Sequence, residues 1–314
     1  MELTFLGTGS GVPSKIRNVS SMALQMLQER DEVWLFDCGE ATQHQIMHTT
    51  IKPRKITKIF ITHLHGDHIF GLPGLLSSRS FQDGTTPVHI YGPQGIKAFV
   101  ETSFSVSSTQ LKYPIYYHEL TEGLVFDDEQ ISVDAKKLAH GVPSYGFLIR
   151  EKDQIGRLIP EKLKKKGVKP GPIYQDIKAN ERMTLSDGTV IIRDEVTGPP
   201  IPGRKVAIMG DTLPKSDLAD FVKEVDVLIH EATFTHQDKE LAQQYNHSTS
   251  EDAAKIAKQA QVEQLLLTHI SSRYHSKDLE QELKHIKTIF NETLFAFDFD
   301  NYTIDRKEDH HESV

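Results

Sequence analysis

The chain has 314 residues, 38% of them apolar and 25% charged, which is typical of a folded globular protein with a full-sized core. Apolar runs stay shorter than the roughly eighteen residues of a membrane helix, and the N-terminus lacks the pattern of a signal peptide, so a cytoplasmic protein is expected. The net charge of −8 argues against indiscriminate nucleic-acid binding, and the single cysteine excludes an intramolecular disulfide.

The first fifty residues alternate apolar runs with turns. Strands are predicted at 1–6, 20–28 and 32–36, and a helix at 41–48. The Gly-rich turn after the first strand has neither dinucleotide-binding nor P-loop spacing. The next loop carries Lys15 and Arg17, and this pair fits either an ordinary solvated loop or contacts with phosphates.

The strongest chemical signal is a cluster of His63, His65, Asp67 and His68 directly after an apolar run. Alternation in a strand lets the first two imidazoles point the same way, and the turn at Gly66 lets the other two side chains approach them. Imidazole and carboxylate suit Zn²⁺, with Mn²⁺ or Fe²⁺ tolerable. The alternative is a polar loop that happens to hold histidines.

Helices at 69–80 and 95–105, a strand at 88–93 and several strands between 115 and 149 are predicted next, with His140 after one of these strands. Residues 150–204 are rich in Lys, Gly and Pro and are expected to protrude. From Arg150 to Arg182 ten Lys and Arg oppose five Asp and Glu. This segment fits a solvated flexible linker or an arm that grips a polyanion through its lysines.

The last third repeats one pattern, an apolar strand followed by a polar side chain. Strands at 205–209, 225–229 and 264–268 precede Asp211, Glu231 and His269. A capping box from Ser248 to Glu251 is predicted to open a helix ending near residue 260, with His247 just outside it. A helix at 278–290, a strand at 294–299 and a disordered charged tail at 306–314 complete the chain.

Side chains at the ends of several strands are expected to meet at one rim, as they do in layered α/β folds. Taken singly, Asp211 also fits a turn residue, and His140 and His269 fit buried structural histidines. Seven candidates are too many for one tetrahedral zinc and fit two. The natural assignment gives one metal His63, His65 and His140, gives the other Asp67, His68 and His269, and shares Asp211 between both.

This ligand pattern resembles the metallo-β-lactamase superfamily, which implies an α/β protein with an αββα four-layer sandwich and two zinc ions per chain. Within that superfamily, nearly the whole chain resembles the bacterial ribonuclease Z family. The segments that carry this resemblance are Phe5-Leu6-Gly7-Thr8-Gly9, Pro13-Ser14-Lys15-Ile16-Arg17-Asn18, Asp37-Cys38-Gly39-Glu40, Gly171-Pro172, His230-Glu231-Ala232-Thr233, His247-Ser248-Thr249 and Ala296-Phe297-Asp298-Phe299.

The resemblance implies hydrolysis of precursor tRNA after the discriminator nucleotide, leaving a tRNA 3′-hydroxyl and a 5′-phosphorylated trailer. It makes Asp67 the proton acceptor and His247, oriented by Glu231, the proton donor. It also implies a homodimer and a single domain at 1–314 whose flexible arm, 150–193, holds the tRNA. The expected substrate contacts are Lys15, Arg17, Lys164, Lys165, Lys166, Gly171 and Pro172.

Two other functions stay open at this point. One is a different dinuclear hydrolase of the same superfamily, such as a thioesterase or a small phosphodiesterase. The other is a non-catalytic RNA-binding protein. The basic arm distinguishes a ribonuclease Z from the first alternative, because the other hydrolases need no polycationic arm. The metal content distinguishes it from the second, because a scaffold with a degenerate site should hold fewer than two zinc ions per chain.

Overall fold

The computed structural model describes residues 1–307, so most of the tail predicted to be disordered, including His310 and His311, lies outside the described residues. The chain divides into two compact units. The first joins Met1–Arg150 to Lys205–Ile304, and the second contains Glu151–Arg204 and the beginning of the tail.

Two seven-stranded mixed sheets form the first unit. In one sheet the spatial order is β16-β1-β2-β3-β4-β5-β6, and in the other it is β15-β14-β13-β12-β9-β8-β7. The strands of the first sheet are β1 (Glu2–Gly7), β2 (Ser21–Met26), β3 (Glu32–Cys38), β4 (Ile56–Phe60), β5 (Val88–Gly92), β6 (Ile115–Glu119) and β16 (Asn301–Thr303). Those of the second are β7 (Gly123–Asp127), β8 (Ile131–Leu138), β9 (Ser144–Glu151), β12 (Lys205–Ile208), β13 (Val227–Glu231), β14 (Gln264–Thr268) and β15 (Thr293–Phe295).

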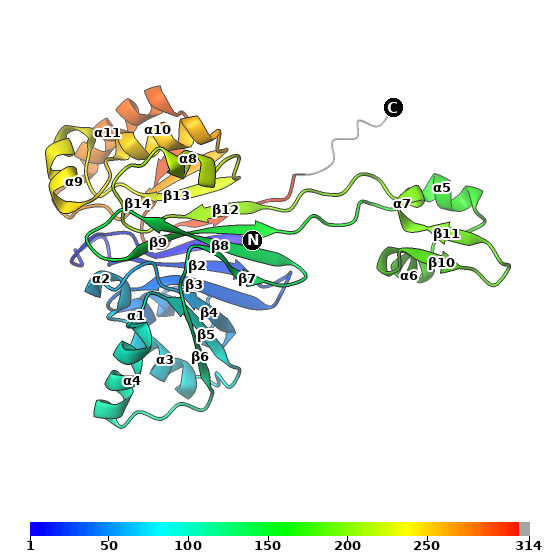
Figure 1. Cartoon of the computed structure of the whole chain (residues 1–314), viewed down its shortest axis with the longest axis horizontal. Helices are drawn as coiled ribbons and strands as arrows, with labels where there is room; N and C mark the ends of the chain where they lie inside the picture. The colour runs from blue at the N-terminus through cyan, green and yellow to red at the C-terminus, as the bar shows by residue number, and fades with distance from the viewer. Residues whose placement is uncertain (308–314) are drawn as a thin grey trace. The chain divides into compact units, whose positions relative to one another are not determined.

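Helices flank both sheets of this unit (Figure 1). Beside the first sheet lie α1 (Thr42–Met47), η1 (Pro53–Lys55), α2 (Gly66–Ile69), α3 (Leu72–Phe81) and α4 (Ile96–Ser107). Beside the second lie α8 (Asp217–Phe221), η2 (His236–Asp238), α9 (Lys239–Tyr245), α10 (Ser250–Ala260) and α11 (Ser276–Ile289).

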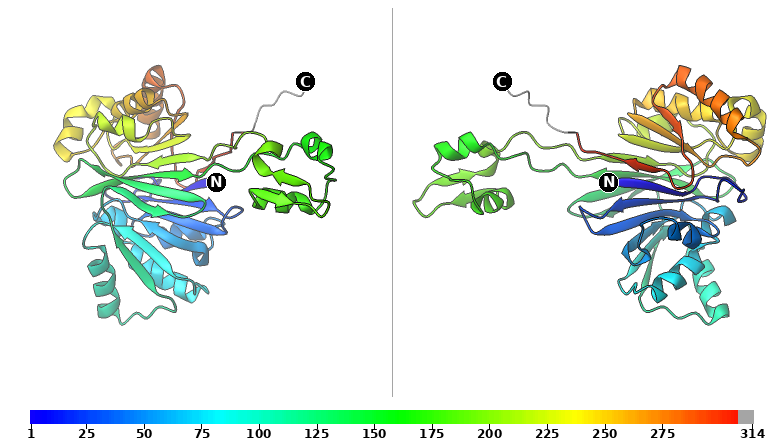
Figure 2. Two further views of the ribbon diagram at one scale, coloured as in Figure 1. Left: turned by 45° about the vertical axis from the view of Figure 1, so that its right-hand side comes forward. Right: turned by 180° about the vertical axis from the view of Figure 1, so that it is seen from behind.

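The alternation of strand side chains separates three apolar cores. On β3, Trp34 and Phe36 face the core between the sheets, whereas Val33 and Leu35 face the helices. A third core lies between the second sheet and its helices, among them α10 and α11. The helices lie outside both sheets in the further views as well (Figure 2), so the predicted αββα four-layer sandwich is confirmed.

Two local predictions need correction. The predicted helix at 69–80 is divided at Gly71, where a Cβ would lie 2.0 Å from the carbonyl oxygen of Gly39, so only glycine permits this close approach of two backbones. The cap of α10 is Thr249 rather than Ser248: the Thr249 hydroxyl accepts from the Asp252 amide at 3.1 Å, and the Asp252 carboxylate accepts from the Thr249 amide. The sequence pattern of a capping box is met both by Ser248 with Glu251 and by Thr249 with Asp252.

The second unit has regular structure that the sequence did not reveal. It contains α5 (Pro160–Lys165), α6 (Ile173–Ala179), α7 (Arg193–Val196) and the hairpin of β10 (Arg182–Thr184) and β11 (Val190–Ile192). Its small core is formed by Leu163, Val168, Ile177, Ile191 and Val196. This folded unit extends beyond the predicted arm, 150–193, to Arg204.

At the base of the second unit, the buried Glu151 carboxylate pairs with Arg204 at 2.8 Å and also with Arg306. Burial alone would raise the pKa of Glu151, but these two guanidinium groups lower it to about 2. None of the helices in residues 1–307 combines the length and apolarity that a membrane span requires.

Candidate active site

The predicted metal-ligating side chains meet at the ends of several strands. His63 follows β4, His140 follows β8, Asp211 follows β12 and His269 follows β14. His63 and Asp211 are buried, whereas His65 is exposed, so the cluster is closed on one side and accessible on the other.

One group of nitrogens comes from His63, His65 and His140. The His65 Nδ1 atom lies 3.0 Å from His63 Nε2 and 3.3 Å from His140 Nε2. Two ligands about 2.1 Å from one tetrahedral zinc are about 3.4 Å apart, so these spacings suit three ligands of a single ion.

A second group is formed by Asp67, His68 and His269. His269 Nε2 lies 3.3 Å from both His68 Nε2 and Asp67 Oδ2. Asp211 Oδ2 lies 3.4 Å from His269 Nε2 and 3.5 Å from both His63 Nε2 and His68 Nε2. The structure therefore brings all seven predicted ligands together, with Asp211 beside both groups. Within residues 1–307 the one further group of this kind, Asp211, His247 and His269, shares two residues with this cluster.

Asp37 orients His68 from behind the cluster. Its Oδ2 atom lies 2.7 Å from His68 Nδ1, and its Oδ1 atom accepts from the Thr62 amide at 2.7 Å. The bond to Asp37 leaves His68 Nε2 facing the other ligands, which is the usual way in which a carboxylate orients a metal-binding histidine. Sequence reasoning missed this role, although an acidic residue directly after the strand run 32–36 was a usable signal.

Backbone and hydroxyl groups orient two more imidazoles. His140 Nδ1 lies 2.8 Å from the carbonyl oxygen of Asn246, which fixes a proton on that nitrogen and leaves Nε2 free. His269 Nδ1 lies 2.7 Å from the hydroxyl of Thr233. Because that hydroxyl donates to Glu231 Oε2 at 2.5 Å, it accepts from the histidine. Both orientations suit metal binding through Nε2, and the role of Thr233 was also missed.

Glu231 and His247 form a pair next to this cluster. Glu231 Oε1 lies 3.0 Å from His247 Nδ1 and accepts from the Thr212 amide at 2.7 Å. Burial alone would lower the pKa of His247, but the Glu231 carboxylate raises it to about 9. Glu231 thus favours the protonated form of His247 and holds its ring in place.

The charges of the cluster fit a bound cation. Burial alone would raise the pKa of Asp211, but the imidazoles around it, His269 foremost, hold it well below its usual value. Burial likewise opposes the charge on His68, yet Asp37 and Asp211 raise its pKa well above the usual value. The buried carboxylates of Asp37 and Asp211 thus favour a positive charge at His68. A metal dication bound by His68 is suited to provide this charge in place of a proton.

The predicted substrate contacts fall into two groups. Lys15, Lys164, Lys165, Gly171 and Pro172 are exposed. Lys166 pairs with Glu195 at 2.6 Å, and Arg17 is only 4% exposed. The prediction that Arg17 contacts phosphate is therefore corrected, because its guanidinium group is buried inside the protein.

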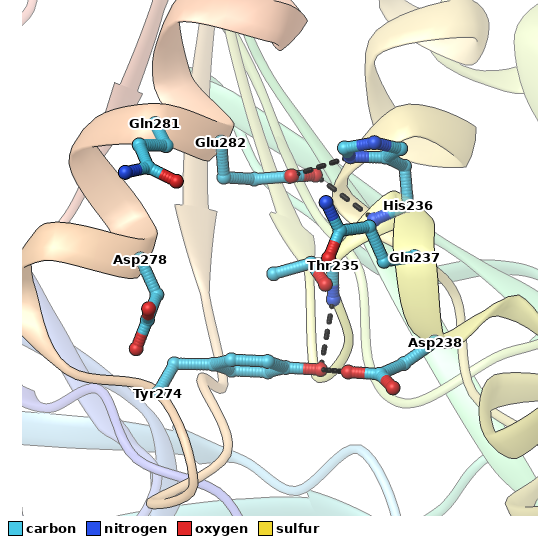
Figure 3. A pocket seen from close by; sticks show the side chains of 8 residues that line it. All are labelled: Thr235, His236, Gln237, Asp238, Tyr274, Asp278, Gln281 and Glu282. Carbon is cyan, nitrogen blue, oxygen red and sulfur yellow. Dashed lines mark hydrogen bonds and ion pairs between the residues drawn. The ribbon is translucent and has the colours of Figure 1, made fainter.

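A separate polar pocket of about 290 Å³ lies between η2 and α11 (Figure 3). The buried Glu282 accepts from the His236 amide at 2.9 Å, and Tyr274 donates to Asp238 and accepts from the Thr235 amide at 3.1 Å. These bonds hold the segment that follows Thr233, so they help to fix its hydroxyl beside His269. None of the predicted ligands lines this pocket.

The fold and this set of side chains define a metal-dependent hydrolase of the metallo-β-lactamase superfamily. Ribonuclease Z of Anoxybacillus flavithermus is 59% identical over 98% of this chain and 98% of its own length. Ribonuclease Z of Oceanobacillus iheyensis is 57% identical over 97% of this chain and all of its own length. The crystal structure of human tRNase Z, short form, is 34% identical with a TM-score of 0.72, covering 97% of this chain and 100% of the human one. The chain belongs to the ribonuclease Z family.

Two further likenesses are found. The family model of the anti-Pycsar protein Apyc1 matches residues 1–156. The metallo-β-lactamase fold protein YhfI of Bacillus subtilis, 19% identical, has a TM-score of 0.66 over 96% of this chain and 98% of its own length, which concerns the fold alone.

Proposed function

We propose that this protein is a zinc-dependent endoribonuclease that removes 3′ trailers from precursor tRNA. Hydrolysis after the discriminator nucleotide would leave a 3′-hydroxyl on the tRNA and a 5′-phosphate on the trailer. The observation that carries the proposal is the convergence of all seven predicted ligands in a chain of the ribonuclease Z family. A cytoplasmic protein acting on tRNA as a homodimer is part of the same proposal.

Two zinc ions, held by the two groups of ligands with Asp211 between them, would acidify water and stabilise the negative charge that develops at phosphorus. Asp67 accepts the proton of the attacking water. Burial alone would raise the pKa of Asp67, but His269 and His68 hold it far below its usual value, so it stays an anion. Its Oδ2 atom is oriented by the Gly11 amide at 2.7 Å.

His247 donates the proton to the leaving oxygen. Glu231 accepts a hydrogen bond from the Nδ1–H group of His247, so Nε2 is the nitrogen that can act on the substrate. An imidazolium held by a carboxylate is a suitable acid at neutral pH because it carries a proton and the hydrogen bond to the carboxylate orients its ring.

The exposed lysines of the second unit would bind the tRNA backbone. Lys164 and Lys165 lie on α5, and Gly171 and Pro172 lie just before α6. Lysine side chains neutralise phosphates without reading bases, so they suit recognition of the shape of tRNA. Lys15 is the cation of the first unit that suits the same task.

Cleavage of a precursor tRNA with mapping of the new 3′ end tests the function. We expect a single cut after the discriminator nucleotide, loss of activity after treatment with a chelator, and recovery with Zn²⁺. Metal analysis of the purified protein should give about two zinc ions per chain. A cut elsewhere, or full activity in metal-free protein, contradicts the proposal.

The Glu231–His247 pair predicts a change in the pH profile. The pKa of His247 is raised, so its acidic form is present at low and neutral pH and is lost as the pH rises through the pKa. Bound metal ions would lower this pKa, and the test therefore compares the direction in which the alkaline limb of kcat moves between the variant and the wild type. In Glu231→Gln, kcat should begin to fall at lower pH than in the wild type, and an unchanged alkaline limb would contradict the role of His247.

A further inference from the structure

A single carboxylate joins the two limbs of the loop that contains residues 8–18. Asp298 Oδ1 accepts from the amide of Thr8 at 3.0 Å and from its hydroxyl at 2.7 Å. Asp298 Oδ2 accepts from the Asn18 amide at 2.6 Å. Between these contacts the limbs pair through the Gly9 amide and the Asn18 carbonyl oxygen at 2.8 Å, so Asp298 closes the neck of the loop.

Arg17 strengthens the same neck from inside. One guanidinium nitrogen donates to the Thr8 hydroxyl at 2.5 Å and to the Ala296 carbonyl oxygen at 2.6 Å, and the group lies 4.3 Å from the ring centroid of Phe297. Burial lowers the pKa of Arg17, and the nearby Asp298 carboxylate offsets part of this effect. Arg17, Thr8 and Asp298 thus form one cluster, which we call the loop clamp.

The tip of the clamped loop touches the site of the reaction. The Gly11 amide donates to Asp67 Oδ2 at 2.7 Å, and the Ser10 amide donates to the carbonyl oxygen of Ile270, the residue after His269, at 3.1 Å. Gly11 has a φ of +70°, a conformation in which glycine is favoured. The loop clamp therefore holds the two ends of the loop together. The Gly11 amide of the same loop contacts the Asp67 carboxylate, which is proposed to accept the proton.

We propose that Asp298 and Arg17 are positioning residues for Asp67. The loop clamp fixes the Gly11 N–H, and this N–H fixes the orientation of the Asp67 carboxylate. An error of about 1 Å in the place of a reacting group can cost on the order of 10²-fold in rate. The inference rests on the proposed function, because it assigns Asp67 the role of proton acceptor.

A direct contact between Arg17 and RNA makes different predictions. Loss of a phosphate contact raises KM, weakens the salt dependence and leaves small substrates unaffected. Loss of the clamp lowers kcat on every substrate, because the acceptor itself is displaced. A short chromogenic phosphodiester therefore separates the two effects.

The test compares Asp298→Ala, Asp298→Asn, Arg17→Ala and the double variant with the wild type on precursor tRNA and on the chromogenic phosphodiester. We expect Asp298→Ala and Arg17→Ala to lower kcat roughly 10- to 100-fold on both substrates, with KM for tRNA changed less than about threefold. Asp298→Asn keeps one acceptor oxygen and should be less affected. The double variant should be no worse than the poorer single one, because both remove the same cluster.

Zinc content and thermal unfolding are measured on each variant. Thr8→Val, which removes only the hydroxyl between Arg17 and Asp298, serves if the alanine variants do not fold, and a decrease of kcat on both substrates is expected there too. Asp220→Asn, an exposed carboxylate on α8, is the charge control and should match the wild type. Normal kcat in folded clamp variants, or a rise in KM for tRNA alone, overturns the inference. Failure of the wild type to cut precursor tRNA would instead overturn the proposed function.

Discussion

Replacing Asp67 by alanine is expected to lower kcat for precursor-tRNA cleavage by roughly 10³-fold or more, while the Kd for tRNA stays close to that of the wild type. A general base alone contributes about 10²- to 10⁴-fold, and the same carboxylate lies 3.3 Å from His269 Nε2, where it suits a metal ligand. Apart from Lys15, the lysines proposed to hold the tRNA belong to the second unit, and removing one carboxylate from the first unit leaves all of these charges unchanged.

Single-turnover cleavage and a filter-binding or anisotropy titration measure the two quantities separately. Asp67→Asn is the companion variant, because it keeps the size of the side chain and an oxygen acceptor for the Gly11 N–H but removes the proton acceptor. It should lose cleavage almost as fully as Asp67→Ala while retaining more zinc. Equal loss of binding and cleavage in either variant would mean that the metal cluster itself holds the RNA.

The ligands were predictable because each follows an apolar strand closely. His63 and His65 are two residues apart, and this spacing already places both side chains on the same side. The residues that orient the ligands were not predictable in the same way. Asp37 reaches His68 across 31 positions and Thr233 reaches His269 across 36, so their partners depend on how strands pair.

For Arg17 the sequence predicts a contact with the substrate at the surface, whereas the side chain is buried. An arginine in a short polar loop is usually solvated, and the sequence contains no sign that Asp298, 281 positions later, lies beside it. Once the strands β1 and β16 pair, the segment 296–298 is brought to the neck of the loop, and the guanidinium group is buried. Burial of a charge is thus a property of the tertiary structure, and here a carboxylate far along the chain offsets only part of its cost.

The sequence predicts a protruding arm or linker at the second unit but not its folded core, because the composition conceals that core. Lys, Gly and Pro dominate the printed letters, whereas the apolar residues that pack together, Leu163, Ile177 and Ile191 among them, stand far apart. Small cores of this kind give weak periodicity, since each helix or strand offers only one or two side chains.

Removal of the second unit should separate binding of tRNA from chemistry. Residues 152–203 can be replaced by a short Gly-Ser turn, because β9 and β12 are antiparallel neighbours with Lys205 opposite Arg150, and the Glu151 amide donates to the Arg204 carbonyl oxygen at 2.8 Å. Among the described residues, the three cores of the first unit contain none from this segment, so the first unit should still fold.

This variant should lose roughly 10²-fold or more in kcat/KM for precursor tRNA, mainly through KM, while hydrolysis of a chromogenic phosphodiester is retained. Each lost phosphate contact should flatten the plot of log Kd against log salt by about 0.9. Lys164→Glu with Lys165→Glu should reproduce part of the loss, whereas Lys258→Glu with Lys284→Glu, exposed lysines of the first unit, should not. Unchanged tRNA processing without the second unit would refute its role in binding, whereas loss of both activities would show that the first unit needs it for its own structure.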